Sequence, residues 1–172
     1  MIFSIKPDNC TGCLACVVYC SLAHEGGVNP ELSRIRVYQT ESRQTILPVV
    51  CLPCDEKPCI QACPQGAISL HACGAVIIDE SLCTGCSRCV RACGIGAIHF
   101  HRLSGRGKNG VAVSLKCDQC GGDPWCIRVC PNGAIEAVES SAAAAATFEQ
   151  IRSALEPFRA VKKSERSERQ PA

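Results

Sequence analysis

The sequence predicts a small α+β fold in which short, cysteine-bearing helices lead into β-strands and hairpins. The first observation behind this prediction is that the 172-residue chain contains 17 cysteines, sixteen of which fall into four groups of four. The second is an internal repeat, because the pattern Cys-x-x-Gly-Ala-Ile begins at Cys63, Cys93 and Cys130. Such a repeat indicates a duplicated supersecondary unit. Here the unit is a helical turn, a glycine turn and a strand.

Each group of cysteines has the spacing of an iron–sulfur cluster loop. Groups one and three read C-x2-C-x2-C-x3-C, group two C-x2-C-x4-C-x3-C and group four C-x2-C-x5-C-x3-C. In the first pattern, the bacterial ferredoxin run, the fourth cysteine ligates the other cluster of a pair. The sequence therefore predicts four [4Fe–4S] clusters in close pairs. The sixteen predicted metal ligands are Cys10, Cys13, Cys16, Cys20, Cys51, Cys54, Cys59, Cys63, Cys83, Cys86, Cys89, Cys93, Cys117, Cys120, Cys126 and Cys130.

Zinc and disulfides explain this pattern less well. Structural zinc favours two C-x-x-C pairs held some distance apart, whereas three cysteines within seven residues, as in Cys83 to Cys89, crowd a single zinc ion. A disulfide framework suits a small secreted protein, but the cysteine count is odd and we find no secretory signal before Cys10.

The composition limits the core and the partners. Four Phe, two Tyr and one Trp are a thin supply for an ordinary core, so we expect clusters to fill much of the interior and the apoprotein to be largely unfolded. A net charge of +2 argues against nucleic acid as a partner. No apolar run approaches the roughly 18 residues of a membrane span, and we see no twin-arginine signal. We expect a cytoplasmic protein of an anaerobic or facultatively anaerobic organism.

The elements follow in order along the chain. Residues 32–50 and 97–116 are predicted to form hairpins, and residues 68–79 read as strand, glycine turn and strand. The hairpins at residues 32–50 and 97–116 are expected to form the sheet behind the clusters. Pro64 and Pro131 should end the short helices before them, because proline has no N–H to continue a helix. Group one lacks the repeat after its fourth cysteine, so the chain direction there should differ.

Residues 51–100 look like one complete two-cluster ferredoxin module. We expect this inner module to be inserted within an outer module formed by residues 1–50 and 101–139. Groups two and three then pair, and groups one and four pair around the outside. The predicted ligand sets are Cys51, Cys54, Cys59 with Cys93; Cys83, Cys86, Cys89 with Cys63; Cys10, Cys13, Cys16 with Cys130; and Cys117, Cys120, Cys126 with Cys20.

The C-terminal tail differs in character. Residues 140–161 are expected to form a serine- and alanine-rich linker and an amphipathic helix, and residues 162–172 a disordered end. Phe148, Ile151, Leu155 and Phe158 fall on one face of this helix. The helix could pack on its own core or dock on a partner subunit or a second copy. The alanine–serine lead favours docking.

Three further sets of residues have more than one interpretation. Cys73, the unpaired cysteine, is either a half-buried thiol or a redox-active group. The four histidines are not expected to be ligands, although His24 could hydrogen-bond a cluster sulfide and raise its potential. Six basic residues form either a solvated face or a docking patch for an acidic redox partner. They are Arg88, Arg91, Arg102, Arg106, Lys108 and Lys116.

No catalytic residues are predicted. Catalytic iron–sulfur centres usually leave one iron without a cysteine, whereas sixteen cysteines here serve four clusters. The sequence contains no Rossmann fingerprint, P-loop or nucleophile motif. These features indicate a carrier of electrons.

The order of the four groups, with the second and fourth widened, resembles the iron–sulfur electron-transfer subunits of the dimethyl sulfoxide reductase and formate dehydrogenase type. Three segments look like the small subunits of tungsten-containing aldehyde oxidoreductases: Cys10-Thr-Gly-Cys-Leu-Ala-Cys, Cys20-Ser-Leu-Ala-His-Glu-Gly and Asn29-Pro-Glu-Leu-Ser-Arg-Ile-Arg-Val. Ferredoxin-like proteins associated with carbon monoxide dehydrogenase are similar.

The resemblance implies a duplicated bacterial two-cluster ferredoxin-like fold with inserted β-hairpins, and the same pairing of groups. It also implies a catalytic subunit with a tungsten or molybdenum pterin site that oxidises an aldehyde, and a FAD- or NAD-binding subunit or ferredoxin as acceptor. The alternatives are a free-standing polyferredoxin, or an electron carrier associated with carbon monoxide dehydrogenase or hydrogenase. A redox-sensing module would need an effector domain, for which the tail is too small.

Overall fold

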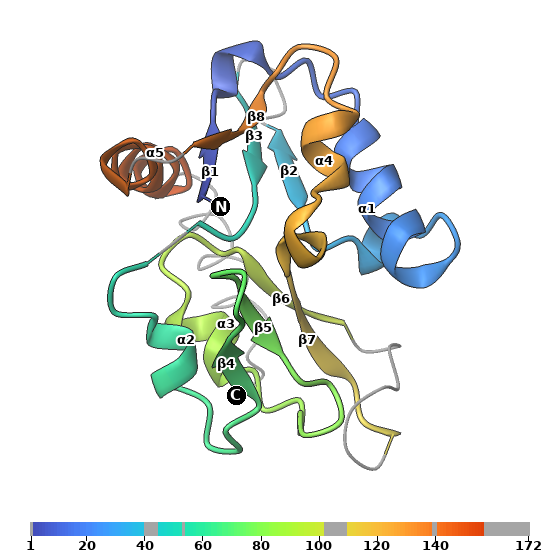
Figure 1. Ribbon diagram of the computed structural model, residues 1–172, viewed down its shortest axis with the longest axis vertical. Helices are drawn as coiled ribbons and strands as arrows, with labels where there is room; N and C mark the ends of the chain where they lie inside the picture. The colour runs from blue at the N-terminus through green and yellow to red at the C-terminus, as the bar shows by residue number, and fades with distance from the viewer. Residues whose placement is uncertain (1, 40–44, 53, 102–109, 139–140, 157–172) are drawn as a thin grey trace, which may run out of the picture.

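The computed structural model describes residues 2–39, 45–52, 54–101, 110–138 and 141–156. The described residues form α-helices, short 3-10 turns and four two-stranded antiparallel sheets, so the expectation of a mixed α and β structure is confirmed. Figure 1 shows the elements in two halves, one above the other. None of the helices in the described ranges is both long and apolar enough to cross a membrane.

The upper half is built from the two ends of the chain. Strand β1 (Ile2–Ile5) pairs with β8 (Ile135–Val138), and helix α1 (Ala15–Glu25) packs against α4 (Trp125–Arg128). Beside them, β2 (Arg36–Gln39) pairs with β3 (Ile46–Val49). Three 3-10 turns connect these elements: η1 (Pro7–Asn9), η2 (Pro30–Leu32) and η4 (Gln119–Gly122).

The lower half comes from the middle of the chain. Helices α2 (Pro58–Gln61) and α3 (Arg88–Ala92) pack together. Strand β4 (Ile68–Leu70) pairs with β5 (Val76–Ile78), and β6 (Ile98–His101) pairs with β7 (Val113–Lys116). Strand β7 also contacts β5, so residues expected in the outer module belong with the lower half.

The predicted hairpins are present, but the single sheet expected behind the clusters is not. Each hairpin in the described residues is a separate two-stranded sheet. The β2–β3 hairpin packs in the upper half, whereas the β6–β7 hairpin packs beside β5 in the lower half, so the two have no shared edge. The turn of the hairpin predicted at residues 97–116 lies mostly outside the described residues.

The C-terminal helix packs on its own chain. Helix α5 (Ser141–Ala154) begins inside the alanine–serine run, which is therefore helix and not a linker. Ile151 and Leu155 are buried against the upper half, and the hydroxyls of Thr147 and Ser4 lie 3.3 Å apart. Of the two alternatives that the sequence left open, packing on its own core is the one seen here, and docking on a partner stays a prediction. Phe158 lies outside the described residues.

Phe148 explains one departure from the repeat. The residue after the fourth cysteine is proline in groups two and four but Gly94 in group three. A Cβ at Gly94 would lie 3.2 Å from the Phe148 ring, so the α5 side chain occupies the space that a larger residue would need.

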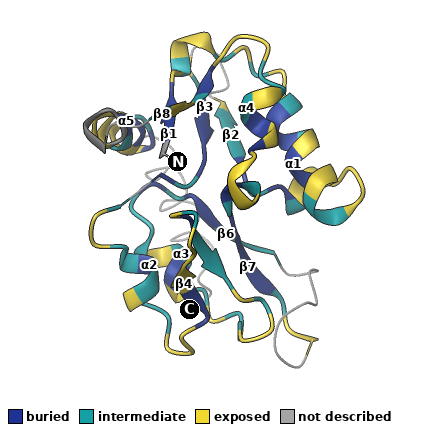
Figure 2. Cartoon of the chain, in the orientation of Figure 1, coloured by how far each residue is buried: buried dark blue, intermediate teal, exposed yellow. Residues whose placement is uncertain are grey.

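The apolar core is unequally shared. In the upper half it includes Phe3, Leu47 and Ile135, and it continues to Ile151 of α5. A separate cluster of buried residues in the lower half has four members, Cys59, Ile68, Cys89 and Ile98. Figure 2 shows buried strands in both halves, among them β1, β3 and β7, and exposed loops at both ends.

Candidate metal centres

The loop that carries the first cysteines of each group turns back on itself just before a helix. The third cysteine of each group lies in the helix: Cys16 in α1, Cys59 in α2, Cys89 in α3 and Cys126 in α4. The residues at the N-caps of α1, α2 and α3 have left-handed backbones, with φ values of 61°, 44° and 57°. This conformation is uncommon for residues other than glycine, and here it turns the loop back towards its own cysteines.

Three cavities are each lined by four cysteines from two groups. Site I contains Cys10, Cys13, Cys16 and Cys130, site II contains Cys20, Cys117, Cys120 and Cys126, and site IV contains Cys63, Cys83, Cys86 and Cys89. Their empty volumes are about 350, 300 and 330 Å³. The similar size and the repeated set of four sulfurs indicate that all three accommodate the same kind of group.

The remaining four cysteines, Cys51, Cys54, Cys59 and Cys93, also lie together, and we name them site III. After burial, the charges of Cys51, Cys93 and Cys59 are the strongest effects that raise the pKa of Cys54, to about 11. The structure thus brings together the same four sets of cysteines that the sequence grouped.

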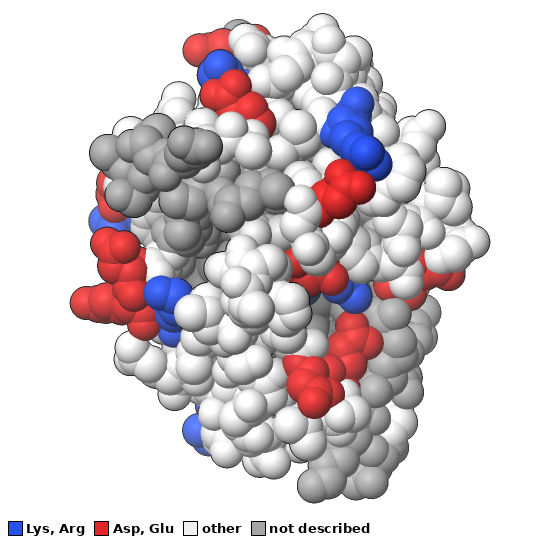
Figure 3. Space-filling model, in the orientation of Figure 1, with Lys and Arg blue, Asp and Glu red and all other residues white. Residues whose placement is uncertain are grey.

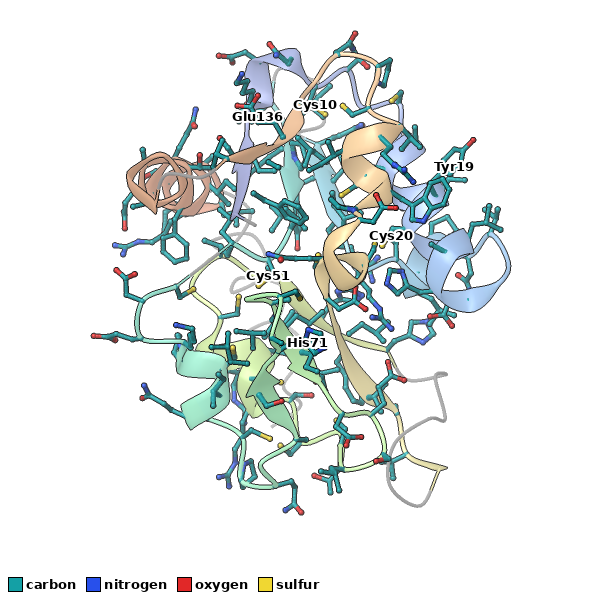
Figure 4. All side chains as sticks on the ribbon, viewed as in Figure 1. Cys10, Tyr19, Cys20, Cys51, His71 and Glu136 are labelled. Carbon is teal, nitrogen blue, oxygen red and sulfur yellow. The ribbon has the colours of Figure 1, made fainter. Side chains whose placement is uncertain are left out.

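The sites form a row from I to IV. Helix α1 carries Cys16 of site I and Cys20 of site II, and α2 with the residues just after it carries Cys59 of site III and Cys63 of site IV. Sites II and III adjoin. Cys51 of site III is close enough to Cys117 of site II that its charge is, after burial, the largest effect that raises the pKa of Cys117. Figure 4 shows Cys10, Cys20 and Cys51 in this order along the long axis.

Two deeply buried thiols of these sites, Cys16 and Cys126, are held in the neutral form by their surroundings. Burial, followed by the charge of Cys10, raises the pKa of Cys16 to about 12. Burial, followed by the charge of Cys120, raises the pKa of Cys126 to about 12. Metal ligands must be thiolates, and a bound metal supplies the positive charge that lets buried thiols lose their protons. The donor sets therefore fit a metal cluster.

Backbone amides point at several of the sulfurs. The N–H groups of Ala97 and Ala134 donate to the sulfurs of Cys93 and Cys130, each at 3.2 Å. Both alanines belong to the Cys-x-x-Gly-Ala repeat, and the glycine before each has a positive φ. The sequence explained this glycine only as a turn. In the structure, the turn also presents the next amide to the fourth cysteine, and such contacts tune cluster potentials.

Site II has an ionic network that the sequence did not reveal. The imidazole of His24 donates to the Asp118 carboxylate (3.0 Å) and to the Cys20 carbonyl (2.7 Å). Arg34 donates to the other Asp118 oxygen at 2.6 Å and also pairs with Glu80. These groups come from distant parts of the sequence, so no spacing pattern links them.

The network changes the protonation of its members. The Asp118 carboxylate is the largest cause that raises the pKa of His24, to about 12. Burial raises the pKa of Cys20, but the hydrogen bonds from His24 and the Arg34 amide together outweigh it and lower the pKa. The Nδ1 atom of His24 is 3.8 Å from the Cys20 sulfur, so this histidine lines site II without replacing a cysteine.

The other histidines lie outside the four sets of cysteines. His71 lies 3.0 Å from the sulfur of Cys73 in the β4–β5 turn, so Cys73 is a half-buried thiol with a local partner. Burial is the largest effect that lowers the pKa of His99, to about 3.

The six basic residues that the sequence grouped are only partly described, and one of them is not at the surface. Arg88 and Arg91 are exposed, but Lys116 is buried, and Arg102, Arg106 and Lys108 lie outside the described residues. On the face drawn in Figure 3, basic and acidic residues are interspersed. The ammonium group of Lys116 lies inside the protein, because β7 is buried along its whole length.

Comparisons with known proteins place the chain among iron–sulfur proteins. The family model described as "4Fe-4S dicluster domain" matches residues 42–140. The "Aliphatic sulfonate oxidoreductase, polyferredoxin-like subunit" of Pyrococcus furiosus is 40% identical over 136 residues, which cover 78% of this chain and 74% of that protein. "Hydrogenase-4 component A" of Escherichia coli is 31% identical, with 77% and 80% covered. An "Iron-sulfur protein" of Rhodospirillum rubrum is 32% identical, with 83% and 84% covered.

Proposed function

The chain belongs to the 4Fe–4S dicluster domain family, and on this premise we propose that it relays electrons along a row of four [4Fe–4S] clusters bound at sites I to IV. It is an iron–sulfur electron-transfer subunit of the kind found in oxidoreductases, and [4Fe–4S] clusters are its cofactors. The observation that carries the proposal is the set of three similar cavities, each lined by four cysteines drawn from two groups.

The sixteen cysteines of the four sites are the proposed ligands. At each site three thiolates of one loop and one thiolate of a partner loop hold the cluster, which gives the row the pairing of a duplicated two-cluster ferredoxin fold. The bound clusters supply one-electron oxidation and reduction. Apolar side chains beside the cysteines, such as Ile35 and Val50 at site II and Ile68 and Ile78 at site IV, limit the access of water.

The two ends of the row are the proposed points of entry and exit. Cys13 of site I and Cys86 of site IV are exposed, whereas the other fourteen cysteines of the sites are buried or half-buried. Cys13 and Cys86 occupy the same place in two Cys-Thr-Gly-Cys segments. A partner can approach an exposed end closely, and sites II and III then connect the two ends.

The proposed donor is a catalytic subunit with a tungsten or molybdenum pterin site, of the aldehyde oxidoreductase type. The proposed acceptor is a FAD- or NAD-binding subunit or a ferredoxin. The segments after Cys10, Cys20 and Asn29 support this assignment, as does the relative named as a polyferredoxin-like subunit of an oxidoreductase. The chain itself is proposed to have no catalytic site.

The second candidate is a free-standing polyferredoxin or a carrier that serves a hydrogenase or carbon monoxide dehydrogenase. The similarity to a hydrogenase component favours it. Anaerobic purification through a tag on this chain, followed by elemental analysis, separates the two. Tungsten or molybdenum in the purified complex supports the pterin partner, and a protein that is isolated alone with only its own iron contradicts it.

A further inference from the structure

Lys116 places a buried positive charge where the two halves meet. It is the last residue of β7, is 5% exposed and directly precedes Cys117 of site II. Its ammonium donates to two backbone carbonyls, those of Cys117 (3.0 Å) and of Val76 on β5. None of the carboxylates in the described ranges lies within ion-pair distance of it.

A buried cation needs a compensating negative charge, because burying an isolated ion is strongly unfavourable. Lys116 pairs across the β6–β7 sheet with Ile98, which belongs to the same buried cluster as Cys59 of site III. Burial raises the pKa of Cys59, and the Lys116 charge is the largest effect that opposes it. Lys116 also lowers the pKa of Cys54 and Cys117 against the larger effect of burial. Its charge therefore acts on site III, through Cys54 and Cys59, and on site II, through Cys117.

We propose that the ammonium of Lys116 is the internal counter-charge of sites II and III and raises the reduction potentials of the clusters held there. This inference rests on the proposed function. When one electron passes to a site, no bond forms or breaks, and the only change in charge is one additional negative unit. A cation in a low-dielectric interior stabilises that unit more than one in water does, and net charge is one of the factors that set cluster potentials.

The position of Lys116 has a consequence for transfer between the halves. Because one charge acts on two adjacent sites, it raises both potentials and changes the difference between sites II and III less than it changes either potential. The exposed Arg88 and Arg91 cannot do the same for site IV, since water and salt screen exposed charges. The central sites are then better electron acceptors than they would be without Lys116.

The test compares three variants of the full-length, cluster-loaded protein by redox titration monitored by electron paramagnetic resonance. Lys116→Gln removes the charge but keeps an N–H donor, and Lys116→Arg keeps the charge. The matched control is Lys57→Gln, which removes a lysine from the Cys54–Cys59 loop of site III, where the ammonium bonds the Asp55 carbonyl at the exposed surface.

For Lys116→Gln we expect two midpoint potentials to fall by at least about 59 mV, which for one electron corresponds to a tenfold change in the ratio of reduced to oxidised cluster. The other midpoint potentials of this variant should shift by less than about 18 mV, which corresponds to a twofold change in the same ratio. All the midpoint potentials of Lys57→Gln should also stay within this limit. Lys116→Arg should restore most of the shift. The proposal is rejected if Lys116→Gln leaves every potential within about 18 mV of the wild type, or if Lys57→Gln gives the same shift.

Iron analysis of each variant keeps the outcomes separate. If Lys116→Gln loses iron, Lys116→Met replaces it and is judged by the same shifts. If both neutral variants lose iron and Lys116→Arg keeps it, the charge serves assembly and not potential, and the proposal is rejected. A wild-type protein with far fewer than about 16 Fe would instead contradict the proposed function itself.

Discussion

The two halves of the molecule hold the same number of cysteine sites on very different supports. In the upper half, α1, β1, β3, β8 and α5 share a continuous apolar core that includes Phe3, Leu47 and Ile151. In the lower half, two of the four buried residues in the core cluster, Cys59 and Cys89, are themselves proposed ligands. The upper half can retain structure through side-chain packing, whereas the lower half depends on what its cysteines bind.

The difference has a simple origin in the chain. The upper half gains an eleven-residue helix, α1, and a fourteen-residue helix, α5, whereas α2 and α3 have four and five residues. Helices this short are not stable by themselves, since the first turn of a helix is unfavourable to form. Their positions must come from the loops and from the bound clusters.

Removal of the iron should give the largest effect and should separate the halves. After anaerobic chelation, we expect amides from α2 to β7 to exchange hydrogen within seconds, and amides of β1, β3, β8 and α5 to remain partly protected. The reason is that metal binding supplies folding free energy most where little apolar core exists. Hydrogen exchange followed by mass spectrometry measures this. Equal loss of protection in both halves would show that the core of the upper half is not self-sufficient.

Gly85→Ala should empty site IV. The φ of Gly85 is +68°, and a Cβ there would lie 2.5 Å from the Ala112 carbonyl oxygen, which belongs to the backbone and cannot move aside easily. We expect the variant to lose one cluster, about 4 Fe, by iron analysis.

Gly66→Ala is the matched control for that variant. It has a similar φ of +63° in the same half, but a Cβ there meets nothing within 4 Å. It should keep all its iron and lose only about 1 kcal/mol of stability. If Gly66→Ala also loses iron, backbone conformation and not the collision with Ala112 governs site IV.

Ile151→Ala tests how far α5 supports the upper half. Ile151 is fully buried, so the substitution should lower the free energy of unfolding by about 2–4 kcal/mol, as measured by urea denaturation under anaerobic conditions. Arg152→Ala, at an exposed position beside it, should change stability by no more than about 0.5 kcal/mol. A result for Ile151→Ala as small as that of Arg152→Ala would mean that α5 is detached from the core in solution.

Lys6→Ala should have the smallest effect. Lys6 pairs with Glu136 at 2.9 Å, and the pair closes the end of the β1–β8 sheet, but both side chains are substantially exposed. We expect a loss of less than about 1 kcal/mol by the same denaturation assay. A larger loss, which Glu136→Ala alone also produces and the Lys6→Ala, Glu136→Ala double variant does not increase, would show that an ion pair and not apolar packing holds the two ends together.

The sequence predicted what depends on local spacing. The four groups of cysteines, the hairpins at residues 32–50 and 68–79, and the strands after each Gly-Ala pair follow from residues close together in the chain, and the structure has them. It did not predict the network of Arg34 with Asp118 or the burial of Lys116. Both require the chain to bring distant segments together, and nothing in their spacing signals it.

The packing of α5 on its own core was the less favoured of two alternatives, for a related reason. The alanine–serine run was interpreted as a linker, although alanine has the highest helix propensity of all residues. One signal was available: Gly94 replaces the proline of the other repeats, and the structure fills the space above it with Phe148. A departure from a repeat can thus mark the place where another element packs.

The central claim, a row of four [4Fe–4S] clusters, is tested most directly by iron and sulfide analysis of the full chain purified without oxygen. The account predicts about 16 Fe and an equal amount of acid-labile sulfide per chain, with resonance signals from interacting clusters after reduction. A protein that contains a few zinc ions and little iron or sulfide would contradict it.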